Sequence, residues 1–227
     1  MILHMDFQIV KVKEDILIEN NKKADSLRAF LKEKGIYFIN VMASPGSGKT
    51  TLLTRVINSL KSKYRIGVLE ADIDGDVDAE RISQNTCVKV IQVHTSGACH
   101  LTAQMVEDAL IAFGVDNLDV IILENVGNLV CPAEFDTGSN INMMLLSTSE
   151  GHDKPLKYPL MFQVSNIAVI SKMDVAVIFD FDLNKAKENI LYRNPEAKIF
   201  ALSSIKNEGV DSLINYLDSL IQQSKKI

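Results

Sequence analysis

The feature that most constrains the fold is a glycine-rich segment between a short apolar run and a helical pattern. The apolar run covers residues 36–42, and the next segment reads Ala43-Ser-Pro-Gly-Ser-Gly-Lys49-Thr50-Thr51. Glycines let the backbone curl so that successive N–H groups point at a phosphate, and the following helix N-terminus adds positive potential. The segment matches the phosphate-loop pattern GxxxxGK[ST], except that Ala43 stands at the first glycine position. It predicts a nucleotide-binding strand–loop–helix unit.

The side chains of this loop are expected to have different roles in nucleotide binding. Lys49 is expected to neutralise the β- and γ-phosphates, and the Thr50 hydroxyl is expected to bind Mg²⁺. The remaining residues expected to contact the nucleotide here are Gly46, Ser47, Gly48 and Thr51.

Short apolar runs and helical patterns alternate along the rest of the chain. Further apolar runs cover residues 66–69, 88–93, 120–123, 141–146, 167–170 and 199–202. Helical patterns cover residues 50–60, 101–113, 182–192 and 210–221. Short buried runs that alternate with helices are typical of a mostly parallel sheet covered on both faces. The predicted fold is therefore α/β, a mostly parallel, doubly wound P-loop sheet with ligands beyond the carboxyl ends of the strands.

The chain before the first apolar run has a different character. Ala24, Leu27, Phe30 and Leu31 recur at helical spacing among polar residues, and Gly35 is a plausible stop. We expect residues 1–35 to form a peripheral helical extension that packs one stripe against the body. No repeat or linker divides residues 36–227, which are expected to form one P-loop GTPase domain.

Charge and apolar content exclude several classes of protein. Lys and Arg number 24 against 29 Asp and Glu, a net charge of −5, which argues against a broadly basic nucleic-acid-binding protein. No apolar run approaches the ~20 residues needed to cross a bilayer. Three cysteines cannot all pair, and no signal peptide is recognisable, so we expect a cytoplasmic protein in a reducing compartment.

Carboxylates gather after the second apolar run. Asp72 stands at the expected carboxyl end of that strand, where it can hold Mg²⁺ directly or through water, and Asp78 is the alternative for this role. A calcium loop starting at Asp72 fails, because Val77 occupies the glycine position and Ser83 the glutamate position.

A single acid ends the apolar run at residues 120–123. Burying a carboxylate there is costly unless it is paired or binds a metal. Glu124 is therefore expected to order the Mg²⁺ shell or the attacking water, and Gly127 to let the backbone approach the γ-phosphate. GTPases usually carry Asp-x-x-Gly at this place, and Glu-x-x-Gly is a variant.

A base-reading element is expected after the run at residues 167–170. The sequence Ser171-Lys172-Met-Asp174 stands where GTPases carry Asn-Lys-x-Asp. The Asp accepts two hydrogen bonds from guanine N1 and N2 and the Lys stem stacks on the ring; adenine lacks that donor pair. Ser203 lies in a downstream loop where GTPases contact the base.

Two cysteines and a histidine suggest a transition-metal site. Cys99 and His100 precede an expected helix, whose N-terminus would lower the pKa of the thiol, and Cys131 lies seven residues after Glu124. Such a set suits Zn²⁺ or Ni²⁺ but lacks a fourth ligand, which a two-fold dimer or an outside group would supply. Spacing alone is equally compatible with ordinary buried residues. Cys87 is expected to be a core residue, and no role is expected for His4, His94 and His152.

Taken together, several segments resemble one family over residues 36–209. They are SPGSGKTTLL (44–53), DAERI (78–82), CHLTAQMV (99–106), ENVGNLVCPAEFDTG (124–138) and EGHDKPLKYPLMF (150–162). They are similar to the hydrogenase nickel-incorporation GTPases, the HypB family, within the signal-recognition and nitrogenase-iron-protein class of P-loop NTPases.

The resemblance implies a GTPase that dimerises with GTP and helps to load nickel into [NiFe]-hydrogenase. Implied partners are a second copy, a HypA-type nickel-binding companion and the hydrogenase large subunit. Implied ligands of Ni²⁺ or Zn²⁺ at the dimer interface are Cys99, His100 and Cys131. Implied Mg²⁺ contacts are Thr50, Asp72 and Glu124, and implied base contacts are Lys172 and Asp174.

Two departures accompany this resemblance: Ser171 replaces the usual Asn, and the chain has no His-rich or Cys-rich storage motif. Ala133 distinguishes the chain from the related urease-type GTPases, which carry Cys-Pro-His at this place. Because Glu124 and Cys131 share one short segment, nucleotide state is expected to move Cys131 and thereby link hydrolysis to metal capture or release. Two alternative functions remain for the protein. One is a nucleotide-gated dimer whose zinc is purely structural, and the other is an ATP-dependent P-loop enzyme.

Overall fold

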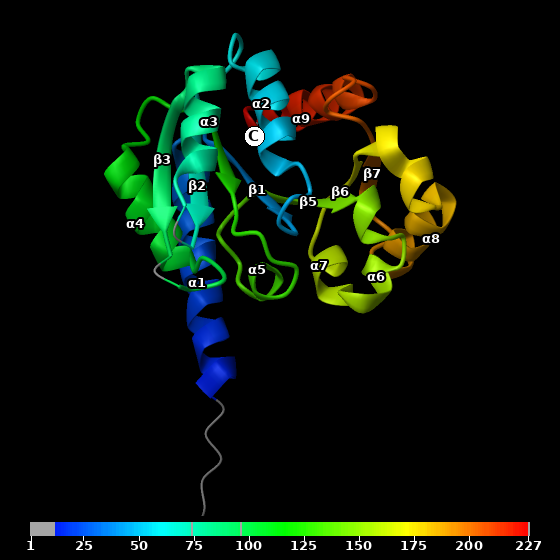
Figure 1. Ribbon diagram of the computed structural model, residues 1–227. Helices are drawn as coiled ribbons and strands as arrows, with labels where there is room; N and C mark the ends of the chain where they lie inside the picture. Colours follow the sequence, from blue (N-terminus) through cyan, green and yellow to red (C-terminus); the bar gives the residue numbers. More distant parts are fainter. Residues whose placement is uncertain (1–11, 74, 96, 227) are drawn as a thin grey trace, which may run out of the picture.

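A parallel sheet of seven strands in the order β3-β2-β4-β1-β5-β6-β7 forms the centre of the molecule (Figure 1). The computed structural model describes residues 12–73, 75–95 and 97–226, and within them every ladder of this sheet is parallel. Each strand coincides with an apolar run, so the predicted α/β class is confirmed. The strands are β1 Tyr37–Ala43, β2 Ile66–Asp72, β3 Lys89–His94, β4 Val120–Glu124, β5 Ile141–Ser147, β6 Ile167–Ser171 and β7 Lys198–Ala201.

Helices connect the strands and cover both faces of the sheet. The four helical patterns expected after residue 36 are confirmed as α2, α4, α8 and α9. Among the described residues, no helix combines the length and the apolar character needed to span a membrane. The α-helices are α1 Val12–Glu33, α2 Lys49–Leu60, α3 Val77–Thr86, α4 Ala103–Phe113, α5 Cys131–Glu134, α6 Lys154–Lys157, α7 Pro159–Gln163, α8 Leu183–Arg193 and α9 Val210–Ser224, and the 3₁₀ helices are η1 Thr148–Glu150 and η2 Met173–Phe179.

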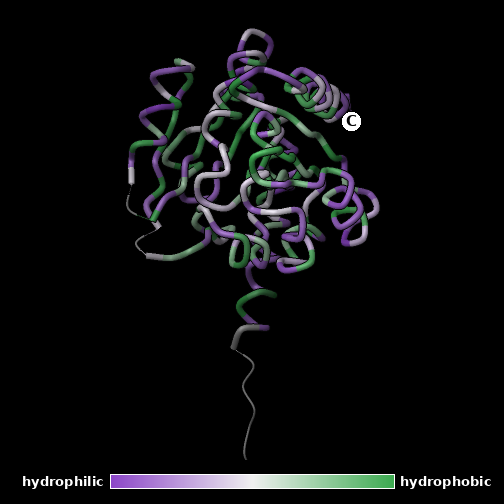
Figure 2. Tube along the Cα trace, turned by 45° about the vertical axis from the view of Figure 1, so that its right-hand side comes forward, coloured by the Kyte–Doolittle hydropathy of each residue, from purple (hydrophilic) through white to green (hydrophobic). Residues whose placement is uncertain are grey.

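Alternation along the strands builds a core on each face. Ile39 and Val41 on β1 pack with α2 and α9, whereas Phe38 packs on the opposite face with α1 and α4. Farther along that second face, Met42 joins a cluster with α7 and α8. Successive side chains of a strand point to opposite faces, so a strand buried on both faces is apolar throughout. Figure 2 shows hydrophobic positions concentrated along these central strands.

The first helix packs one stripe on the body, as expected, and ends near Gly35, whose φ is +68°. Ala24, Leu27 and Leu31 are buried, but Phe30 is 42% exposed, so its expected burial is wrong. Phe30 lies at the rim of the stripe, beside a groove between α1 and α4. The division of the chain at residue 35 stays a prediction.

The order of the strands places the phosphate loop at a switch point. β1 lies between β4 and β5; β2 and β3 lie on the β4 side and β6 and β7 on the β5 side. Because connections depart in opposite directions from this point, a crevice opens beyond the carboxyl end of β1. The loop that follows β1 therefore lies where the fold offers a ligand site.

Candidate nucleotide and metal sites

The phosphate loop has the backbone that its glycines predict. Gly46 and Gly48 have φ values of +71° and +97°, in the left-handed region that residues with a Cβ avoid. Lys49 then begins α2. All six loop residues expected to bind the nucleotide line one cavity of 240 Å³, and they are Gly46, Ser47, Gly48, Lys49, Thr50 and Thr51.

Glu124 enters this cavity from the end of β4. It is 2% exposed, and its Oε1 accepts a hydrogen bond of 2.9 Å from the Thr50 hydroxyl. Burial raises the pKa of Glu124 to about 7, although the Lys49 charge and the Thr50 hydrogen bond act in the opposite direction. Its Oε2 is buried without a partner. A buried oxygen of this kind is costly unless a ligand satisfies it, and a carboxylate beside a hydroxyl suits Mg²⁺.

Glu70 is a residue of this site that the sequence analysis did not single out. It pairs in register with Glu124 across β2 and β4, and it is only 3% exposed. Burial, followed by the neighbouring Glu124 charge, raises the pKa of Glu70 to about 8. Strand alternation was the available signal, because residues 70 and 72 lie on one side of a strand.

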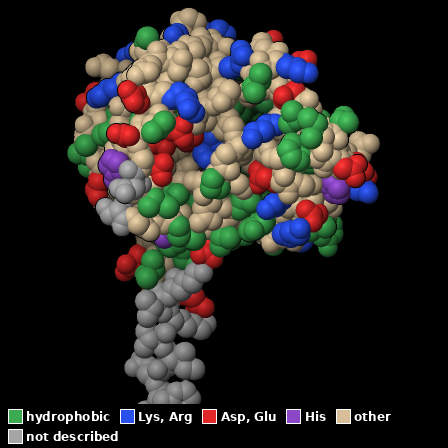
Figure 3. Space-filling model, in the orientation of Figure 1, with side chains coloured by type: hydrophobic (Ala, Val, Ile, Leu, Met, Phe, Trp, Pro, Cys, Tyr) green, Lys and Arg blue, Asp and Glu red, His purple; other side chains and the backbone are tan. Residues whose placement is uncertain are grey.

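Both aspartates considered for Mg²⁺ line an adjoining cavity of 220 Å³ together with Glu70 and Glu124. Asp72 Oδ1 accepts a hydrogen bond of 2.5 Å from the Ile73 backbone, and Asp78 lies 3.4 Å from Arg81. The structure thus brings both aspartates to the site. The space-filling view shows acidic side chains gathered beside a hollow on this face (Figure 3).

The segment after Glu124 lies directly against the phosphate loop. A Cβ added to Gly127 would come within 3.1 Å of the Pro45 backbone nitrogen and 3.2 Å of its Cα. Gly127 does not have a positive φ, so its backbone conformation does not require glycine. Glycine is favoured here because the Pro45 backbone leaves little room for a Cβ.

The base-reading residues meet at a neighbouring cavity of 50 Å³. Lys172 and Asp174 line it. Asp174 Oδ1 accepts a hydrogen bond of 2.6 Å from the Ser203 hydroxyl, which is the main cause that lowers the pKa of Asp174. Ser203 thus supports Asp174, whereas Ser204 and Ile205 of the same expected loop line the cavity themselves.

Ser171 occupies the asparagine position of the GTPase pattern. Its hydroxyl donates a hydrogen bond of 2.7 Å to the Ser47 carbonyl, and both residues are buried. Lys172 Nζ adds a hydrogen bond of 2.6 Å to the Gly46 carbonyl. The end of β6 is therefore attached to the phosphate loop at two points.

The Cys/His set comes together in space. Cys99 and Cys131 are free thiols whose sulfurs lie 2.7 Å apart, and His100 Nδ1 lies 3.8 Å from Cys99 Sγ. One ligand atom from each residue lies within 4.8 Å of the others. Within residues 12–73, 75–95 and 97–226, no other group of three or more His, Cys, Asp or Glu side chains has this geometry. Two sulfurs and one imidazole nitrogen suit Ni²⁺ or Zn²⁺.

Local electrostatics differ from the expected lowering of the Cys99 pKa. The hydrogen bond with Cys131 and burial instead raise it, and α4 starts only at Ala103. Burial lowers the pKa of His100, which favours the neutral imidazole that binds metals. The His100 ring stacks on Phe135 at 3.8 Å between ring centroids.

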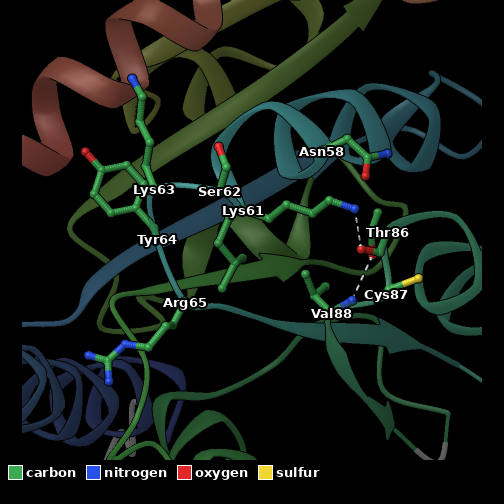
Figure 4. A pocket seen from close by; sticks show the side chains of 10 residues that line it. Asn58, Lys61, Ser62, Lys63, Tyr64, Arg65, Thr86, Cys87 and Val88 are labelled. Atoms are coloured by element: carbon green, nitrogen blue, oxygen red, sulfur yellow. Dashed lines mark hydrogen bonds between the residues drawn. The ribbon is translucent and has the colours of Figure 1, made fainter.

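The expected burial of Cys87 is wrong. Cys87 is exposed and caps the C-terminus of α3 with a φ of +57°, a surface position that leaves its thiol outside the core. It lines a cavity of 680 Å³ at the amino ends of β2 and β3, where Lys61 Nζ donates a hydrogen bond of 2.9 Å to the Thr86 carbonyl (Figure 4). This cavity lies at the opposite edge of the sheet from the phosphate loop.

Neither described histidine outside the set joins the metal cluster. His94 is exposed at the end of β3. His152 Nδ1 accepts a hydrogen bond of 3.4 Å from the Asp182 backbone, and its ring meets the edge of Phe181. His4 lies outside the described residues.

Known proteins share both this fold and this sequence pattern. The nucleotide-binding domain family CobW/HypB/UreG matches residues 37–201. The hydrogenase maturation factor HypB of Escherichia coli (strain K12) is 40% identical over 212 residues, which cover 93% of this chain and 73% of that protein.

Solved structures agree with these matches. The crystal structure of HypB from Helicobacter pylori in complex with nickel has a TM-score of 0.84 and 37% identity, and it covers 91% of this chain and 97% of its own. The signal recognition particle receptor FtsY from Elizabethkingia anophelis in complex with GDP, with a TM-score of 0.52 and 15% identity, shares the fold alone.

Proposed function

Since this chain belongs to the HypB family of hydrogenase maturation factors, we propose that it is a GTP-hydrolysing nickel metallochaperone. It dimerises with GTP and assists nickel insertion into the large subunit of [NiFe]-hydrogenase in the cytoplasm, together with a HypA-type nickel-binding companion. The observation that carries this proposal is the Cys99, His100 and Cys131 set, in which Cys131 lies four residues after Gly127, a residue that lines the nucleotide cavity.

The phosphate loop binds the triphosphate in this proposal. Lys49 neutralises the β- and γ-phosphates, and the backbone N–H groups between Gly46 and Thr51 surround them. Thr50, Asp72 and Glu124 hold Mg²⁺, which supplies charge neutralisation for the phosphates. The unpartnered Glu124 Oε2 and its hydrogen bond to Thr50 support this assignment.

Asp174 selects guanine over adenine in this proposal. The lowered pKa of this carboxyl keeps it ionised, so that it accepts hydrogen bonds from guanine N1 and N2. Ser203 fixes its orientation, and the Lys172 stem covers the ring while Nζ holds the Gly46 carbonyl.

Nickel is the cargo of the Cys/His set. Thiolates and a neutral imidazole bind the ion, and the two Cys protons leave when it enters. Three ligands leave a tetrahedral site one short, so a second copy of the chain is expected to complete it across a dimer interface.

The bound nucleotide changes metal affinity through one short segment, residues 124–131. Glu124 and Gly127 contact the phosphate-loop side, and Cys131 follows them on the same stretch of backbone. Ligand distances at a metal site tolerate deviations of only about 0.2 Å, so a small shift of Cys131 is enough to change affinity.

The proposal is tested by titrating Ni²⁺ into the wild type, Cys131→Ala and Cys87→Ala, with GDP and with a non-hydrolysable GTP analogue. Dimerisation is followed in the same samples by light scattering. Cys131→Ala is expected to lose high-affinity nickel, and Cys87→Ala to keep it because Cys87 is exposed and far from the set. Equal nickel affinity in the GDP and GTP-analogue states would refute the coupling, and equal affinity in Cys131→Ala and the wild type would refute the site.

A further inference from the structure

One buried amide side chain bridges the two segments that carry the metal ligands. Asn20 of α1 is 7% exposed; its Oδ1 accepts a hydrogen bond of 2.8 Å from the Ala103 backbone N–H, and its Nδ2 donates one of 2.9 Å to the Asp136 carbonyl. Ala103 begins α4, three residues after His100, and Asp136 follows Cys131 by five residues.

We propose that Asn20 is a positioning residue for the metal site, because it sets the separation between the segment of Cys99 and His100 and the segment of Cys131. The inference rests on the metal site of the proposed function and extends it to a helix that contributes no ligand.

The Cys131 side of this bridge is held at further points along α1. Arg28 forms two hydrogen bonds with the Asp136 carboxylate, at 2.7 and 2.8 Å, and a third of 3.0 Å with the Ser139 carbonyl. A Cβ on Gly138 would lie 3.0 Å from the Ala24 carbonyl oxygen, so the backbone after Cys131 lies directly against α1.

On the side of Cys99 and His100, the bridge is attached to the first turn of α4. The Ala103 N–H belongs to the first turn of α4, where N–H groups lack helical partners, and Ala103 is fully buried. Asn20 therefore satisfies a donor that water cannot reach. An ion pair between Lys23 and Glu107 joins the same two helices, and Figure 1 shows α1 running beside α4.

The thiol hydrogen bond of 2.7 Å between Cys99 and Cys131 joins the two ligand segments directly, but it is lost when both thiols give up their protons as a metal ion binds. The other direct contacts are weaker than the Asn20 bridge. Asn128 Nδ2 lies 3.5 Å from the Cys99 carbonyl, at the limit of a hydrogen bond, and His100 stacks on Phe135. A ring stack permits sliding, whereas a side chain bonded to both backbones does not. Partners of this kind that orient a metal site typically change its affinity 10–100-fold when they are removed.

The test uses the full chain with Ni²⁺ as the probe. The variants are Asn20→Ala, which removes both hydrogen bonds, and Asn20→Asp, which keeps the acceptor for Ala103 and loses the donor to Asp136. Asn21→Ala is the matched control, since Asn21 is the adjacent, exposed residue of the same type. Nickel affinity is measured by competition with a chromophoric chelator, together with the thiolate-to-nickel charge-transfer spectrum and GDP affinity.

Both Asn20 variants are expected to weaken nickel binding by about 10–100-fold and to shift the charge-transfer band, with GDP affinity unchanged. Asn21→Ala is expected to match the wild type. Asn20→Asp keeps an acceptor for the buried Ala103 N–H, so it provides the answer if Asn20→Ala fails to fold. If folded Asn20→Asp has the nickel affinity and spectrum of the wild type, the role of Asn20 is overturned and the metal site still stands. Nickel binding that survives Cys131→Ala would overturn the metal site and this inference with it.

Discussion

Thr50 donates a hydrogen bond of 2.9 Å to Glu124, and this bond joins the helix of the phosphate loop to the strand that leads to Cys131. The two residues are 74 positions apart in the chain, and both are buried. A group that enters between them to bind the second, unpartnered oxygen of Glu124 must act on both elements. The Thr50–Glu124 hydrogen bond thus connects the nucleotide cavity to the segment that carries Cys131.

The buried carboxyl pair predicts how stability depends on pH. The folded pKa values of Glu70 and Glu124, about 8 and about 7, lie above those of the unfolded chain, so the folded protein binds more protons between about pH 4.5 and these values. The contribution of these two carboxyls to the free energy of unfolding of the nucleotide-free, Mg²⁺-free protein is therefore fully present below the unfolded pKa of about 4.5. It falls by several kcal/mol as pH rises through the folded values, since one pKa unit corresponds to about 1.4 kcal/mol. Urea unfolding across this range measures it. Glu70→Gln is expected to reduce the fall, and the exposed Glu188→Gln is not. A fall of the same size in Glu70→Gln and the wild type would contradict this origin.

Ser171→Ala is expected to weaken GDP binding roughly fivefold, because it removes a buried hydrogen bond worth about 1 kcal/mol between β6 and the Ser47 carbonyl. Fluorescent GDP titration measures the effect. Ser62→Ala is the control, since Ser62 is exposed at the opposite edge of the sheet. If Ser171→Ala binds GDP as the wild type does, this bond does not support the nucleotide site.

Asp174→Asn is expected to lower GDP affinity by about 100-fold or more, because two charge-assisted hydrogen bonds to guanine are lost. The wild type is expected to prefer GDP to ADP in a nucleotide panel. Asp180→Asn is a suitable control: Asp180 is exposed, and its φ of +47° is one that Asn accepts. A wild-type preference for ADP would reverse the role assigned to Asp174.

Gly127→Ala tests the connection between the two sites. Ala can adopt the backbone conformation of Gly127, but its methyl group would press on the Pro45 backbone at 3.1 Å. The difference in nickel affinity between the GDP and GTP-analogue states is expected to shrink, while metal binding itself persists. Val130→Ala, on the same segment and 52% exposed in the wild type, is expected to keep the full difference. A full difference in Gly127→Ala as well would show that the signal takes another route.

For some residues the sequence predicts the role but not the neighbouring side chains. Asp174 and Ser203 were both expected near the base, yet the hydrogen bond between them makes Ser203 a support for the carboxylate. The Cys99 pKa was expected to fall, but the hydrogen bond with the Cys131 thiol and burial raise it. Cys87 was expected in the core because cysteine is an apolar residue type, whereas it caps a helix at the surface. In each case the neighbours, and not the residue type, decide the outcome.

The amino-acid sequence by itself determines the seven strands, the glycine conformations of the phosphate loop and the order of the nucleotide-binding elements. These are local properties, set by side-chain alternation and by the backbone freedom of glycine within a few residues. Only the tertiary structure decides that Glu70 faces Glu124, that Cys99 reaches Cys131 and that Asn20 bridges their segments. Those contacts follow from the order and register of the strands and from the packing of α1, which bring together residues between 32 and 116 positions apart.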